Sequence, residues 1–166
     1  MGRAYGFPPG RTGSGEFIGE RNFLMETLDG EILACADSSW AYIDTKTGHP
    51  VKASEEERAV YPIEEKLDMK PLGRKIRIPE ERQEMGCFTV RQYHLDSNHH
   101  VNNAQYIRLS QEYIPADFQV QRLRAEYKRQ AVLGDRIFPL VSKTEDSYVV
   151  ALCNEEKEPY AVVEFA

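Results

Sequence analysis

The feature that most constrains this chain is a short polar segment, residues 94–103 (HLDSNHHVNN), between an expected strand and an expected helix. Residues 87–94 before it suit a strand, and residues 103–114 after it place mostly apolar side chains at helical spacing. Segments of this kind often carry function, because rigid elements hold them in place. Free N–H groups in the first turn of the helix can also stabilise negative charge. The sequence therefore predicts a functional site in this segment.

The residue types in this segment suit the hydrolysis of a carbonyl compound. Such a reaction needs a base for water, a partner that orients the base, and donors for the oxyanion. His100 can be the base, because an imidazole changes its charge near neutral pH. Asp96 could orient an imidazole or hold a developing positive charge, and Asn98 could donate to a carbonyl oxygen or hold water. Asp96, Asn98, Asn102 and Asn103 also suit a cap and a turn before the helix, so both interpretations stand at this point.

A metal site is another chemistry that this segment suggests. Its imidazoles and carboxylate are metal-binding groups, carried by His94, Asp96, His99 and His100. Metal-binding spacings such as HExxH and CxxC are absent, and no second cluster of ligands follows in the sequence. We therefore expect no metal and no organic cofactor. His94 is expected at a strand end and His99 in an exposed position.

Composition and charge exclude several other classes of protein. No run of about 18 apolar residues occurs, so we expect no membrane span. The Gly- and Pro-rich start, residues 1–15, does not resemble a signal peptide. The net charge of −6 argues against general binding of nucleic acid. The cysteines, Cys35, Cys87 and Cys153, fit buried free thiols better than disulfides, which indicates a reducing, cytoplasmic location.

The first part of the chain is expected to form two strands, residues 16–27 and 31–44, joined by a turn at Asp29-Gly30. Apolar side chains keep one phase along the second strand, at Ile32, Ala34, Ala36, Trp40 and Tyr42. Residues 49–85 are expected to form a connector, with a short helix over residues 54–60 that a capping box opens. The basic residues of the connector are expected on a solvated face: Lys70, Arg74, Lys75, Arg77 and Arg82.

The second part of the chain combines one helix with several strands. Pro115 is expected to end the helix that begins at residue 103. Further strands are then predicted at residues 120–130, 136–143, 147–154 and 160–165. This order, strand, helix and then successive strands, suits an α+β domain in which an antiparallel sheet packs on one helix.

The polar segment also resembles the signature of a known family. Asp96-x-Asn98-x-His100-Val101-Asn102-Asn103, followed by Tyr106-Ile107, resembles the motif of the acyl-ACP thioesterases. Residues 125–129 (AEYKR), 21–23 (RNF) and 38–40 (SSW) are similar to that family as well. The resemblance covers most of the chain.

The resemblance implies a hotdog fold, an antiparallel sheet wrapped around one long helix. Members of the family generally carry two hotdog units in one chain. Residues 86–166 are then expected to be a complete second hotdog domain, and residues 49–85 its connector. Residues 1–48 are expected to be the closing strands of a truncated first hotdog unit. Sheet edges left open by the missing part would favour a homo-oligomer.

The resemblance further implies an enzyme that hydrolyses fatty acyl-ACP to a free fatty acid and the carrier thiol, in fatty acid biosynthesis. It places the family's catalytic residues on Asp96, Asn98 and His100. Where the family often has a carboxylate after the next strand, this chain has Gln130, which is expected to orient water. The next residue is Ala131, so a cysteine nucleophile is not available there and water is the expected nucleophile.

The expected partner is an acyl carrier protein, which is acidic and would require a basic surface. Two groups of residues are candidates: the basic residues of the connector, and the group of Arg122, Arg124, Lys128 and Arg129. Two alternatives stay open, a non-catalytic hotdog fragment that binds acyl chains or a partner subunit, and another hotdog enzyme such as an acyl-CoA thioesterase. In the family, the first hotdog unit forms most of the acyl tunnel. We therefore expect low activity from this chain by itself.

Overall fold

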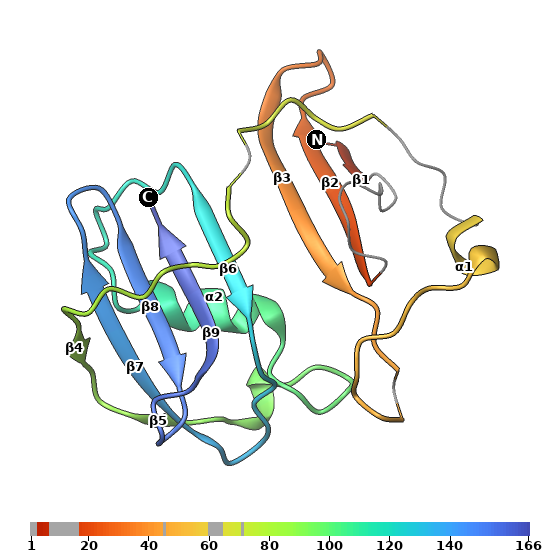
Figure 1. Cartoon of the computed structure of the whole chain (residues 1–166). Coiled ribbons are helices and arrows are strands. Elements are labelled where there is room, and N and C mark those ends of the chain that lie inside the picture. The colour runs from red at the N-terminus through yellow and green to blue at the C-terminus, as the bar shows by residue number, and fades with distance from the viewer. Residues whose placement is uncertain (1–2, 7–16, 45, 60–64, 71) are drawn as a thin grey trace. The chain divides into compact units, whose positions relative to one another are not determined.

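The structure is a computed structural model, and it describes residues 3–6, 17–44, 46–59, 65–70 and 72–166. The chain divides into two compact units, an N-terminal unit of residues 1–72 and a C-terminal unit of residues 73–166 (Figure 1). The domain boundaries expected at residues 48 and 85 stay predictions. Residues 16 and 60, at the ends of two predicted elements, lie outside the described residues.

The N-terminal unit contains an antiparallel sheet and a short helix. The sheet has the order β1-β2-β3, and the elements are β1 (Arg3–Gly6), β2 (Ile18–Glu26), β3 (Ile32–Ala41) and α1 (Glu55–Ala59). The predicted strand pair and helix are confirmed in type. Gly30 makes the turn between β2 and β3 at a φ of 86°, which favours glycine. The register pairs Phe23 with Ala36 and Met25 with Ala34, so the in-phase apolar residues of β3 share a face with those of β2.

The C-terminal unit packs an antiparallel sheet against one helix. The strand order is β4-β7-β8-β9-β6, and β5 also pairs with β7. The elements are β4 (Gln83–Glu84), β5 (Phe88–Thr89), the 3₁₀ helix η1 (Gln92–His94), α2 (Asn103–Gln111), β6 (Leu123–Tyr127), β7 (Arg136–Lys143), β8 (Tyr148–Cys153) and β9 (Pro159–Phe165). In Figure 1, α2 lies behind this sheet. The predicted α+β architecture, with one helix on an antiparallel sheet, is confirmed for this unit.

Both faces of this sheet are buried, because apolar residues occupy both phases of β8. Val150 and Leu152 belong to the cluster on the face toward α2, which also contains Tyr106. Val149 and Ala151 belong to a second cluster on the opposite face. A sheet with apolar residues in both phases needs a cover on each side.

Part of the predicted connector supplies the cover of the outer face. Ile76 is 6% exposed and belongs to the second cluster. Figure 1 shows its segment crossing the sheet on the side away from α2. The basic residues of this stretch are exposed, as expected: Arg74, Lys75, Arg77 and Arg82. Residues 73–84 therefore pack on the C-terminal unit through an apolar side chain and carry their charges on the solvent side.

The strand predicted at residues 87–94 is wrong over most of its length. Only β5 is a strand, and η1 follows it. The N–H of His94 donates to the carbonyl of Arg91, and the N–H of Leu95 donates to that of Gln92. These local hydrogen bonds replace a strand ladder. The predicted helix also ends early, at Gln111 instead of residue 114.

The prediction of free cysteines is confirmed for all three, and the prediction that they are buried is confirmed for one. Cys153 is buried in the outer cluster, where burial raises the pKa of its thiol. Cys35 and Cys87 are exposed, contrary to the prediction, and all three cysteines are free. Cys87 lies just before the short β5, where no ladder buries it, and its Sγ accepts a hydrogen bond from Arg136. Among the described residues, no helix is long and apolar enough to cross a membrane.

Candidate active site

The polar segment folds into a tight loop around the carboxylate of Asp96. Its Oδ1 accepts the N–H of Asn98 at 2.8 Å and the N–H of His100 at 3.4 Å. The N–H of Asp96 donates to the carbonyl of His100 at 2.8 Å. His99 closes the loop at a φ of 61°, which is uncommon for a residue other than glycine. Asp96 therefore orients the residues of the motif through their backbone N–H groups.

The end of the motif starts helix α2. The Oδ1 of Asn102 accepts the N–H of Ala104 at 2.9 Å, which is an N-cap. The N–H of Asn102 donates to the carbonyl of His94 at 2.9 Å, and Leu95 forms a bridge with Val101. The capping interpretation of the motif is thus correct for Asn102. The turn interpretation is also correct for Asp96, whose Oδ1 accepts the N–H of Asn98 within the loop.

His94 is buried in the 3₁₀ helix η1 and does not lie at the end of a strand, where it was predicted. It is 4% exposed in η1, and its Nδ1 accepts the N–H of Arg91 at 3.0 Å. Its ring makes edge contacts with Tyr93 and Phe88. Burial, and then the charge of Arg91, lower the pKa of His94. His94 thus supports the start of the motif as a buried imidazole. His99 is exposed, as predicted.

The loop lies against the residues that follow β6. His100 forms an antiparallel bridge with Val132, and the N–H of Val101 donates to the carbonyl of Ala131 at 2.9 Å. Gln130 therefore lies in the segment that pairs with the motif, although it is 30 positions away from His100 in the sequence. Its side chain is exposed and has no hydrogen bond within the described part of the chain.

Two residues near this junction were not predicted. The Oη of Tyr106 accepts the N–H of Ala131 at 2.9 Å, and Asp135 Oδ2 accepts the N–H of Val132 at 2.9 Å. Tyr106 was visible in the sequence as part of the motif, but its contact is a tertiary one. Asp135 lies in the connection between β6 and β7, and no pattern in the sequence linked that connection to the motif.

The described residues contain no group of three or more His, Cys, Asp and Glu side chains that could hold a metal ion. Asp96 has its Oδ1 turned to backbone N–H groups, and His94 is buried. Two of the residues suggested for a metal, His94 and Asp96, thus accept backbone N–H groups instead. Hydrogen bonds to the backbone therefore hold this loop together.

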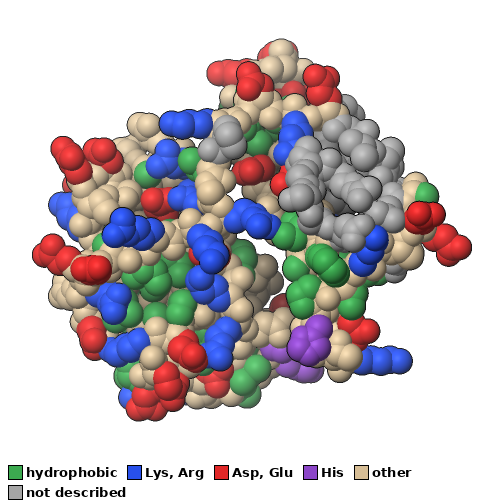
Figure 2. All heavy atoms as spheres, viewed as in Figure 1, with side chains coloured by type: hydrophobic (Ala, Val, Ile, Leu, Met, Phe, Trp, Pro, Cys, Tyr) green, Lys and Arg blue, Asp and Glu red, His purple; other side chains and the backbone are tan. Residues whose placement is uncertain are grey.

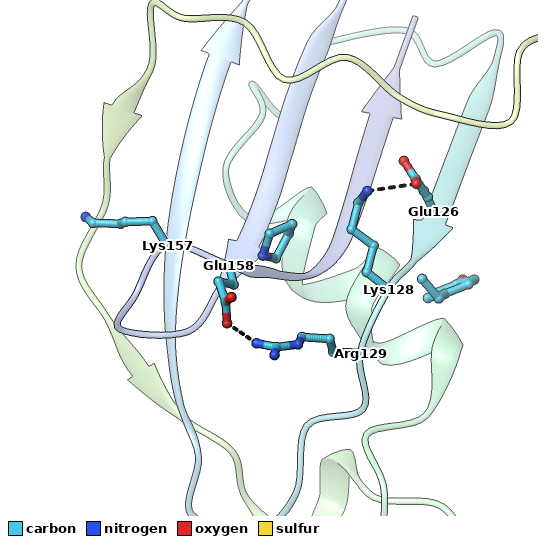
Figure 3. A pocket seen from close by; sticks show the side chains of 7 residues that line it. Glu126, Lys128, Arg129, Lys157 and Glu158 are labelled. Atoms are coloured by element: carbon cyan, nitrogen blue, oxygen red, sulfur yellow. Dashed lines mark hydrogen bonds and ion pairs between the residues drawn. The ribbon is translucent and has the colours of Figure 1, made fainter. Parts of the chain in front are cut away.

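Charged side chains gather on the outer face of the C-terminal unit. In Figure 2, Lys and Arg side chains are scattered over this face, with Asp, Glu and hydrophobic side chains among them. A shallow, open depression there is lined by Glu126, Tyr127, Lys128, Arg129, Lys157, Glu158 and Pro159. Figure 3 shows that Lys128 pairs with Glu126 and that Arg129 pairs with Glu158. The cations of the depression are thus largely neutralised by neighbouring acids.

Glu126 ties this face to the covering segment. Its Oε2 accepts the N–H of Ile76 at 2.9 Å, and its Oε1 pairs with Lys128 at 2.8 Å. Burial opposes ionisation of this carboxyl, but the bonds from Lys128 and Ile76 outweigh burial and lower the pKa of Glu126. Of the second group of basic residues, Arg124 also pairs with an acid, Glu164, at 2.8 Å. Arg74, Lys75 and Arg77 make no ion pair within the described part of the chain, and neither does Arg122.

Comparisons with known proteins agree with the motif. The family described as the acyl-ACP thioesterase C-terminal domain matches residues 78–158. The crystal structure of an acyl-ACP thioesterase from Bacteroides thetaiotaomicron is similar to this chain, with a TM-score of 0.84 and 19% identity. That likeness covers 98% of this chain and 66% of the other. A comparison with curated proteins gave no match.

A second solved structure, of a candidate oleoyl thioesterase from Lactobacillus plantarum, has a TM-score of 0.71 and 22% identity. It covers 90% of this chain and 61% of the other, so this chain spans less than two thirds of each structure. At these identities the two structures establish the fold. The family match contains both the motif and Gln130. Residues 78–158 of this chain therefore belong to the family of the acyl-ACP thioesterase C-terminal domain.

Proposed function

We propose that this protein hydrolyses fatty acyl-ACP thioesters to a free fatty acid and the carrier thiol, in fatty acid biosynthesis. One observation carries the proposal most strongly. The loop that Asp96 holds together lies against the segment that carries Gln130, through the bridge between His100 and Val132. Residues 30 positions apart in the sequence thereby meet at the start of α2. The family match supports the choice of a thioester as the substrate.

In the proposed mechanism, water attacks the carbonyl carbon of the thioester. His100 takes a proton from the water, or polarises the carbonyl, as the tetrahedral intermediate forms. Asn98 is exposed, so its amide is free to donate to the carbonyl oxygen or to hold the water. The C–S bond then breaks, and the carrier thiolate leaves and takes up a proton. Gln130 orients the water, because a carboxamide can accept one hydrogen bond and donate another.

Asp96 has two parts in this proposal. Its carboxylate fixes the loop through the N–H groups of Asn98 and His100. Its negative charge, at the same place, stabilises positive charge that develops on the imidazole of His100. The two parts are separable, because a carboxamide at this position keeps an oxygen acceptor and loses the charge.

The proposed partner is an acyl carrier protein, met by the exposed basic residues Arg74, Lys75 and Arg77. Charges at the rim of an interface chiefly set the association rate and its salt dependence. A homo-oligomer formed through sheet edges also stays a proposal, as does the interpretation of residues 1–48 as closing strands of a preceding hotdog unit. β6 supports the proposed homo-oligomer, since it lies at an edge of its sheet and has β9 as its neighbour.

The test compares two adjacent histidines. Release of the thiol from acyl-ACP and from acyl-CoA is measured for the wild type, His100→Ala and His99→Asn. We expect His100→Ala to lower kcat by about 10²–10⁴-fold. His99→Asn is the matched control and should keep wild-type activity, because asparagine tolerates the positive φ of this position.

Turnover by His100→Ala at the wild-type rate would remove His100 from the mechanism. Binding of acyl-ACP without any release of thiol by the wild type would instead favour the non-catalytic alternative. Faster hydrolysis of acyl-CoA than of acyl-ACP would contradict the proposed carrier.

A further inference from the structure

The segment that carries Gln130 is held by two side chains outside the catalytic set. We propose that Tyr106 and Asp135 are positioning residues, which set where Gln130 lies relative to His100. Each accepts a backbone N–H of the two residues that follow Gln130, at Ala131 and Val132. The inference deepens the function proposed above and rests on it for its effect on catalysis.

Tyr106 holds the segment from the side of helix α2. It is 2% exposed, and its Oη accepts the N–H of Ala131, which is itself fully buried, at 2.9 Å. The carbonyl of Ala131 accepts the N–H of Val101, also at 2.9 Å. Burial raises the pKa of Tyr106 to about 12, so its hydroxyl stays protonated at neutral pH. Both backbone groups of Ala131 are therefore fixed, one by the helix and one by the motif.

Asp135 holds the same segment from the other side. Its Oδ2 accepts the N–H of Val132 at 2.9 Å and the hydroxyl of Tyr160 at 3.3 Å. Its own N–H donates to the carbonyl of Val132 at 3.2 Å, and its carbonyl accepts the N–H of Val90 at 2.9 Å. Gly134 completes this turn at a φ of 89°. Val132, which bridges His100, is thus fixed at both its N–H and its carbonyl.

The position of the backbone matters here because of what Gln130 can do. A carboxamide acts only through directional hydrogen bonds, so its effect depends on where its Cα lies. The Gln130 side chain has no hydrogen bond of its own within the described part of the chain. Its placement therefore depends on the backbone that Tyr106 and Asp135 hold. A displacement of about 1 Å at a catalytic group can cost about 10²-fold in rate.

The first measurement tests directly whether Tyr106 and Asp135 restrain the segment after Gln130, and it does not depend on enzymatic activity. Amide hydrogen exchange is followed by NMR for Ala131 and Val132 in the wild type, Tyr106→Phe and Asp135→Ala. We expect about tenfold faster exchange at Ala131 in Tyr106→Phe and at Val132 in Asp135→Ala, because each of these amides loses one hydrogen bond. Asp135→Asn keeps an oxygen acceptor and should restore slow exchange. Tyr127→Phe is the control, because its hydroxyl donates to the carbonyl of Asn103 and not to this segment.

The second measurement tests whether Tyr106 and Asp135 affect catalysis through the position of Gln130. Gln130→Ala is made in the wild type, in Tyr106→Phe and in Asp135→Ala, and kcat and KM are measured for each. We expect each background variant to lower kcat about tenfold or more with little change in KM. Adding Gln130→Ala to either background should then lower kcat by much less than it does in the wild type.

Unchanged exchange at Ala131 and Val132 would overturn the inference, and so would full additivity of Gln130→Ala with both background variants. Should Asp135→Ala fail to fold, Tyr160→Phe weakens the same carboxylate by one hydrogen bond and takes its place. A wild type that hydrolyses no acyl thioester would contradict the proposed function. The exchange rates would still show whether Tyr106 and Asp135 position the segment.

Discussion

Substitution of Asp96 separates its structural part from its electrostatic part. Its Oδ1 makes one short hydrogen bond, to the N–H of Asn98 at 2.8 Å, and one long one, to the N–H of His100 at 3.4 Å. A hydrogen bond to a charged group contributes about 1.5–3 kcal/mol, and the long bond adds little. Because Asp96 is only partly buried, we expect Asp96→Ala to cost about 1.5 kcal/mol of the free energy of unfolding.

Asp96→Asn should behave differently in stability and in catalysis. Its amide oxygen can accept the same N–H groups, so we expect a loss of stability below about 1 kcal/mol. It carries no charge to support an imidazolium at His100, so kcat should fall by about tenfold or more. Two unit charges about 4 Å apart interact by about 1 kcal/mol in bulk water and by about 4 kcal/mol near a protein surface.

The assay pairs urea unfolding with thiol release for the wild type, Asp96→Asn and Asp96→Ala. A third variant, Asp117→Asn, changes an exposed acid outside the motif and controls for net charge. Unaltered unfolding of Asp96→Ala would refute the role of the carboxylate in holding the loop. Unaltered kcat of Asp96→Asn would refute its electrostatic part and leave Asp96 as a loop residue alone.

Two further predictions concern the outer face of the C-terminal unit. Charge reversal at Arg74, Lys75 and Arg77 should lower the association rate with acyl carrier protein and flatten the salt dependence of that rate, which stopped-flow binding can measure. Lys143→Glu, at the end of β7, is the control and should change neither quantity. Equal salt dependence in both variants would contradict docking at residues 74–77. The pKa of Glu126 is lowered in the folded protein, so its contribution to stability is present above the ordinary carboxyl range and is lost as pH falls through the lower, folded value. Between pH 7 and pH 3, the free energy of unfolding should therefore change less in Glu126→Gln than in the wild type. Glu112→Gln, at an exposed position, is the control and should follow the wild type. Identical pH profiles of the wild type and Glu126→Gln would show that Glu126 has no such role.

Local features of the sequence predicted much of the fold. The strand at residues 136–143 was predicted at the bounds that β7 has, because its apolar residues lie between clear turns. The start of α2 at residue 103 was predicted correctly, and Asn102, one of the residues suggested for a cap, is its N-cap, since capping depends on neighbours in the chain. The strand at residues 87–94 failed because the Nδ1 of a buried histidine, His94, turns the backbone at Arg91, which composition does not reveal.

The candidate site divides in the same way. Asp96, Asn98 and His100 lie within five positions, so a motif alone could bring them together, and the loop around Asp96 depends on short-range hydrogen bonds. The roles given to them stay predictions, as does the role of Gln130. The sequence could not reveal that His94 is buried, because burial depends on packing by residues from other elements.

By itself, the sequence determined the elements whose causes are local: the strands and turns, the cap of α2 and the loop of the motif. Only the tertiary structure decided that Ile76 covers the outer face of the sheet and that the segment of Gln130 lies against His100. The same holds for Tyr106 and Asp135, which reach this segment across the fold. The physical reason is that a hydrogen bond within a loop depends on neighbouring residues, whereas these contacts depend on how the sheet closes on α2.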